Sequence, residues 1–157
     1  MGDGEQFVVG LARRLVTGLA PDELSVFDLV AAEFLRDPGR VLKARVRPGE
    51  TLALGIDTIV LETTTVALAV GTAVHQYLLD RSGEFVVDRT VRLVKKLRRR
   101  KQTGELPEIT PDLCEGAVDG TRRLILDMTG DAALADQCGA LVRVALTQGP
   151  GRGDTGR

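Results

Sequence analysis

The apolar pattern is strongest between Ile59 and Leu79, where the sequence reads IVLETTTVALAVGTAVHQYLL. Seventeen consecutive residues, from Thr63 to Leu79, contain no Asp, Glu, Lys or Arg. A helix that is apolar nearly all round belongs either in the centre of a bundle or in a membrane. We therefore expect a central apolar helix over about 50–79.

Other segments carry apolar residues at helical spacing on one side only, which is typical of helices that cover a core. They span about 5–19, 21–36, 86–101, 110–128 and 131–147. Because such helices need an apolar surface to pack against, the central helix is their natural partner. The pattern predicts a mainly α fold, a bundle of five to six helices around residues 50–79.

Local signals place several helix ends. Pro21 suits a first turn, and the acids Asp22 and Glu23 favour the positive end of the dipole of their own helix. The Asp37-Pro38-Gly39 stretch stops that helix, because the residue before a proline avoids the helical region. In the last third, Thr110 and Asp131 are predicted N-caps, and Thr129-Gly130 ends the helix between them.

We expect one helical domain over residues 1–147. The Gly-rich stretch 148–157 cannot bury a core and is predicted to be a disordered tail. Two short runs of extended character, 41–47 and 84–88, predict at most a small two-stranded β-ribbon beside the central helix.

Polar residues of the central helix fall on one line and form a narrow polar seam. In a soluble bundle this seam faces a shallow groove or a polar neighbour. In the alternative, a membrane-active protein inserts the 52–79 helix, and the seam lines a pore or a helix contact. The soluble reading is favoured because the flanking helices are amphipathic. The seam consists of Thr58, Glu62, Thr65, Thr72 and Gln76.

Charge is unevenly distributed, although the formal net charge is only −1. Residues 81–101 contain nine Lys and Arg against two acids, and 89–101 is predicted to be a basic helix. The simplest explanation for this basic helix is a solvated face, whose charge is balanced by the acidic helices that follow. Phosphate backbones or anionic lipid are the alternatives, so nucleic-acid binding is a second alternative function. The candidate contacts are Arg92, Lys95, Lys96, Arg98, Arg99, Arg100 and Lys101.

Little in the sequence indicates catalysis. His75 is the one histidine, and neither a nucleophile nor a ligand cluster accompanies it. Cys114 and Cys138 have no zinc-type spacing and are expected to be buried free thiols. We therefore expect no catalytic residue, no metal and no cofactor. An acidic N-terminal stretch unlike a signal peptide predicts a cytoplasmic location.

The layout of the middle of the chain adds a resemblance. RVLKARV, a long Ala/Val/Thr helix, a basic end and GEFVVDR follow one another between Arg40 and Arg89. This order resembles small accessory modules that accompany effectors in bacterial NTP-dependent conflict systems, over less than a third of the chain. The resemblance implies an adaptor or signalling role without an active site.

Together these features predict a non-enzymatic protein–protein interaction module, an adaptor or regulator, bacterial and oligomeric. Its expected partner is a second copy of itself or another protein. Nucleic acid and a membrane surface are the partners of the two alternative functions.

Overall fold

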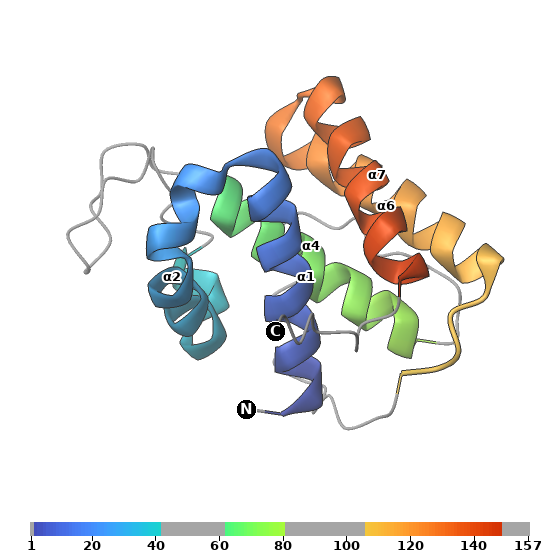
Figure 1. Cartoon of the computed structure of the whole chain (residues 1–157), viewed down its shortest axis with the longest axis horizontal. Helices are drawn as coiled ribbons and strands as arrows, with labels where there is room; N and C mark the ends of the chain where they lie inside the picture. Colours follow the sequence, from blue (N-terminus) through green and yellow to red (C-terminus); the bar gives the residue numbers. More distant parts are fainter. Residues whose placement is uncertain (1, 42–61, 81–105, 149–157) are drawn as a thin grey trace, which may run out of the picture.

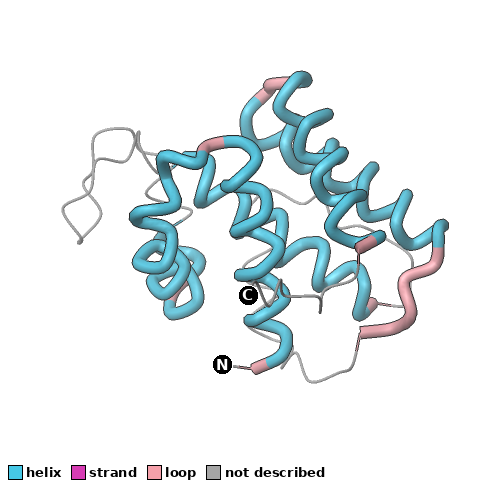
Figure 2. Tube along the Cα trace, viewed as in Figure 1, coloured by secondary structure: helices cyan, strands magenta, loops and turns pink. Residues whose placement is uncertain are grey.

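The computed structural model describes residues 2–41, 62–80 and 106–148, and every regular element among them is helical (Figures 1 and 2). The predicted mainly helical bundle is confirmed. A further helical turn spans 38–41. The elements are α1 (Asp3–Leu19), the 3-10 turn η1 (Pro21–Glu23), α2 (Leu24–Arg36), α4 (Glu62–Leu79), α6 (Pro111–Thr129) and α7 (Ala132–Thr147).

Four predictions fall wholly or partly outside these residues. Val41, the first residue of the predicted β-ribbon, instead lies in the helical turn described over 38–41 and is buried. The rest of the ribbon, the 50–61 part of the central helix and the 148–157 tail beyond Gln148 lie outside the described residues. So does the basic helix 89–101.

Helix α4 lies at the centre of the bundle, where α1, α2 and α6 all pack against it. Every residue from Thr64 to His75 is buried. Its many β-branched residues are only moderate helix formers, so burial rather than intrinsic propensity holds this segment helical. On α4, the residues Val66, Ala67, Val70, Ala73, Val74 and Tyr77 are all buried, as expected of a central apolar helix.

Two buried threonines satisfy their hydroxyl groups within their own helices. Thr72 donates its Oγ1 proton to the carbonyl of Leu68 at 2.8 Å, one turn earlier on α4. Thr121 does the same to Ala117 on α6, also at 2.8 Å. This back-bonding hides the polar atom and leaves the methyl group for packing, so a threonine can sit inside an apolar core.

Helices α1 and α4 run antiparallel and cross at very close range (Figure 1). A Cβ atom built on Gly71 would lie 2.8 Å from the backbone oxygen of Val8, so only glycine fits at this crossing. Further along, the rings of Phe7 and His75 are 5.4 Å apart. His75 is therefore a core residue at the α1–α4 contact, only 1% exposed.

The N-terminal end of α4 is held by a side chain from far along the chain. Glu23, at the α1–α2 junction, is only 8% exposed. Its carboxylate accepts a hydrogen bond from the Thr64 backbone N–H at 2.7 Å and another from the Thr64 hydroxyl. An acid at a helix N-terminus satisfies an orphan donor and complements the helix dipole. We expected Glu23 to serve its own helix, but it caps α4 instead.

Helices α6 and α7 form an antiparallel hairpin whose ends match the predicted signals. The Thr110 side chain accepts from Leu113 N at 3.3 Å, and the Asp131 carboxylate accepts from Leu134 N at 3.0 Å. Gly130 adopts φ 70°, a left-handed conformation that suits glycine after a helix. On the hairpin surface, the guanidinium of Arg143 donates twice to Glu115, at 2.9 and 3.1 Å.

The α1–α4 crossing can be tested with two glycines that have opposite surroundings. We expect Gly71→Ala to lower the free energy of unfolding by about 1–3 kcal/mol, because the new methyl group meets backbone. Gly10→Ala on α1 is the control, since a Cβ there meets nothing within 4 Å. It should raise stability by about 0.5–1 kcal/mol through helix propensity. Urea denaturation measures both, and equal effects would contradict this account of the crossing.

The Glu23 cap predicts a second stability difference. Glu23→Ala should cost about 1.5–3 kcal/mol in urea denaturation, because a buried backbone N–H loses a charged acceptor. Asp22→Ala removes the neighbouring exposed acid and should cost no more than about 1 kcal/mol. If the two variants lose the same stability, the contact with Thr64 contributes nothing beyond an ordinary surface charge.

Candidate functional site

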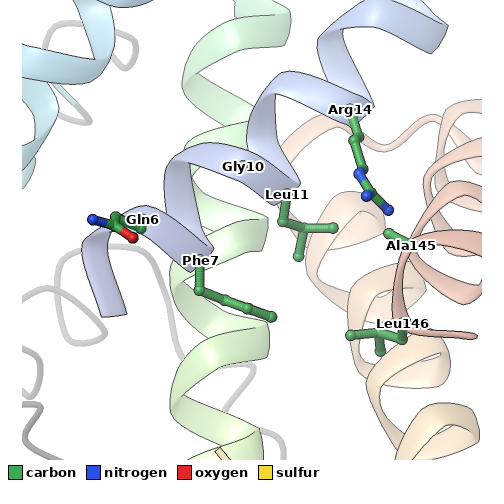
Figure 3. Close-up of a pocket in the computed structure, with 7 residues that line it drawn as sticks. All are labelled: Gln6, Phe7, Gly10, Leu11, Arg14, Ala145 and Leu146. Carbon is green, nitrogen blue, oxygen red and sulfur yellow. The ribbon is translucent and has the colours of Figure 1, made fainter. Parts of the chain in front are cut away.

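A groove of about 230 Å³ runs between α1 and α7, and we call it the α1/α7 groove. Figure 3 shows Leu11, Ala145 and Leu146 facing one another across it, with the Arg14 side chain reaching over the same space. The apolar members form its floor, whereas Gln6 and Arg14 give it a polar edge. Its lining residues are Gln6, Phe7, Gly10, Leu11, Arg14, Ala145 and Leu146.

Two adjacent arginines on α1 have different surroundings. Arg13 forms an ion pair with Asp28 of α2 and stacks over the Phe27 ring, with its guanidinium carbon 4.7 Å from the ring centroid. Arg14 is partly buried and forms no ion pair with any other described residue. A guanidinium beside an apolar surface is poorly solvated and gains most from a carboxylate or phosphate partner. The groove therefore offers an apolar floor and one cation that can hold an anionic group.

A second hollow, of about 240 Å³, lies where the start of α4 meets the α6–α7 turn. Two of its polar groups already bond within the α6–α7 hairpin: Thr129 donates to the carbonyl of Ile125, and Asp131 accepts from Leu134 N. Unlike the α1/α7 groove, this hollow has no cationic residue in its lining. Its lining residues are Leu19, Thr63, Val66, Ala67, Thr129, Asp131, Leu134 and Cys138.

Both cysteines are free and buried, as the sequence predicted. Burial raises the pKa of Cys138 to about 11. Burial, and then the nearby Glu115 charge, also raise the pKa of Cys114. Since the thiolate is the nucleophilic form, raised pKa values make both thiols unreactive near neutral pH.

The predicted polar seam is only partly within the described residues. Thr65 and Thr72 are buried in the core, at 4% and 8% exposure, and Gln76 is partly buried. Thr58 and the side chain of Glu62 lie outside the described part of the chain. Because Thr72 bonds to its own helix, it needs neither a groove nor a polar neighbour.

The basic candidates, Arg92 to Lys101, all lie outside the described residues, so their role stays a prediction. Within residues 2–41, 62–80 and 106–148, no three His, Cys, Asp or Glu side chains are grouped closely enough to hold a metal ion. None of the helices in these ranges has the length and apolar character of a membrane span.

The α1/α7 groove was not among the sites expected from the sequence. One signal was available: Phe7, Leu11 and Arg14 recur at three- to four-residue spacing, which places them on neighbouring positions of one helix. The missing information was the position of α7, whose Ala145 and Leu146 form the opposite wall. A groove between two helices so far apart in the sequence depends on tertiary packing.

The raised pKa of Cys138 predicts how stability depends on pH. The thiol is neutral in the folded protein up to about 11, whereas the unfolded thiol ionises near 9.0. Its contribution to stability is therefore complete below about 9 and declines as pH rises towards 11. We expect the wild type to lose more unfolding free energy across this range than Cys138→Ala. Urea titrations at several pH values measure this, and a constant difference between the two proteins would contradict it.

Comparisons of the chain with protein-family models, with curated proteins and with solved structures find no match. The case for a function therefore rests on the chemistry of the α1/α7 groove and its surroundings.

Proposed function

We propose that the chain is a non-enzymatic protein–protein interaction module, an adaptor or regulator, and that a partner chain docks in the α1/α7 groove. The observation that carries this proposal is Arg14, a partly buried cation at an apolar groove with no ion-pair partner among the described residues. A partner that supplies a carboxylate together with apolar side chains would complement both features.

The size of the groove supports a protein partner over a small ligand. Pockets that enclose drug-sized molecules usually measure about 300–1,000 Å³. At about 230 Å³ the α1/α7 groove is smaller and suits one or two inserted side chains. Arginine and aromatic residues are also enriched at the centres of protein interfaces, and the groove has Arg14 and Phe7 together.

The charge pairs elsewhere support the choice of this site. On the hairpin, Arg122 lies near Asp119 and Asp136, at 3.9 and 3.3 Å. Glu33 of α2 has two cationic neighbours: Arg36 of the same helix at 3.6 Å, and Arg40 of the 38–41 turn at 3.7 Å. These cations already have acidic neighbours and gain less from a partner than Arg14 would.

The resemblance of residues 40–89 to accessory modules of bacterial conflict systems fits this function. An adaptor that accompanies an effector would need a docking face and no active site of its own. We therefore propose a bacterial adaptor as the specific form of the function.

Site-specific photocrosslinking tests the proposal. Gln6 lines the groove and is exposed to solvent, so p-benzoylphenylalanine can replace it at the edge of the groove without filling the groove itself. Under ultraviolet light in the source cell, we expect an adduct heavier than the monomer, identified by mass spectrometry. The yield of the adduct should fall when Arg14→Ala is added, because the groove then lacks the cation that binds the partner.

The same probe at Ser25, an exposed position on α2, is the control. It should give no comparable adduct. An absence of adducts at Gln6, or equal yields at both positions, would overturn the proposed function.

A further inference from the structure

One side of α1 carries residues spaced alternately by four and three, which we call the α1 stripe: Asp3, Phe7, Gly10, Arg14 and Thr17. This spacing keeps residues along one line of a helix and is the spacing used where two helices pack. Asp3, Gly10 and Thr17 are exposed, whereas Phe7 and Arg14 are partly buried. Phe7, Gly10 and Arg14 also line the α1/α7 groove, so the stripe and the groove form one continuous surface.

The charges of the α1 stripe have opposite signs at its two ends. Asp3 lies in the first turn of α1, and Arg14 lies three turns later. Neither forms an ion pair with another residue in the described parts of the chain. An antiparallel copy of α1 would bring each Asp3 near the Arg14 of the other copy. Twofold symmetry would then form this ion pair twice.

Gly10 lies near the middle of the α1 stripe, one to two residues from the point where a twofold axis that pairs Asp3 with Arg14 would pass. It has no side chain, and the space above it is open, since a Cβ there would meet nothing within 4 Å. Two helices that cross at glycine can approach closely, as α1 and α4 already do at Gly71. The same alignment places Phe7 opposite Gly10 of the other copy, where no side chain obstructs the ring.

We propose that a second copy of this chain is the partner at this site, bound antiparallel along the α1 stripe and over the α1/α7 groove. This inference rests on the proposed function and specifies its partner. A second copy is favoured over a different protein because α1 itself carries the acid that Arg14 lacks. A contact through one helix belongs to the small interfaces, below about 1,200 Å², so dimerisation depends on concentration.

Charge reversal at the two ends of the α1 stripe tests the arrangement. In analytical ultracentrifugation the wild type should dimerise as concentration rises. Asp3→Lys and Arg14→Glu should each weaken dimerisation by roughly tenfold, because each replaces two attractive pairs with two repulsive ones. Mixed one to one, these two variants should form a heterodimer, since both ion pairs are then restored. The double variant Asp3→Lys/Arg14→Glu should dimerise with itself again.

Two further variants distinguish an effect on dimerisation from an effect on folding. Glu5→Lys makes the same charge change in the first turn of α1 but away from the stripe, and it should leave dimerisation unchanged. Gly10→Leu should prevent close approach and abolish the dimer. Its melting temperature should stay at or above that of the wild type, because the position is open in the single chain.

The inference is overturned if the wild type stays monomeric at all concentrations, or if the mixed single variants form no heterodimer. A monomeric wild type that still gives a groove-specific crosslink to a different protein would refute the second copy and leave the proposed function standing. If neither a dimer nor a crosslink forms, both fail.

Discussion

Between Thr64 and His75, α4 has no side that water can reach, and the rest of the described structure is arranged around that fact. Helices α1, α2 and α6 each turn an apolar face towards α4. Two contacts fix its place: the carboxylate of Glu23 at its first turn and the glycine crossing with α1 near its middle. With few aromatic residues available, the close approach of small side chains gives this core its packing density.

Those features of the fold that depend only on residues close together in the sequence could be predicted. The N-caps at Thr110 and Asp131 and the stop at Gly130 act within one turn of helix, so their residue types are sufficient evidence. The buried face of α4 was predictable for a similar reason, since a helix that is apolar all round can only be covered.

The contacts between distant residues could not be predicted in this way. Glu23 and Thr64 are 41 positions apart, and in the sequence Glu23 looks like an ordinary acid at the start of its own helix. The close approach of Gly71 to Val8 likewise depends on how α1 and α4 cross. The α1/α7 groove was missed because the first and last described helices form it together, and no local pattern indicates that they are neighbours.

The adjacent residues Arg13 and Arg14 show that the fold uses one charge to hold helices together and leaves the next charge available for binding. One turns towards α2 and is held by an acid and an aromatic ring, whereas the other turns towards α7 and has an apolar surface beneath it. Their directions differ by the 100° that separates consecutive residues on a helix. The packing of α1 between two helices therefore uses one cation for stability and leaves the other on a surface suited to binding.

The enclosure of α4 between Thr64 and His75 also has a consequence for the dynamics of the chain. Its amide protons can exchange with deuterated solvent only when the surrounding helices separate from it, so their protection reports opening of the whole bundle. Helix α2 lies at the edge of the described bundle with Leu29 exposed to solvent, so we expect it to open more readily than α4. Hydrogen exchange should therefore proceed from the edge of the molecule inward, with α4 the last element to lose its protection.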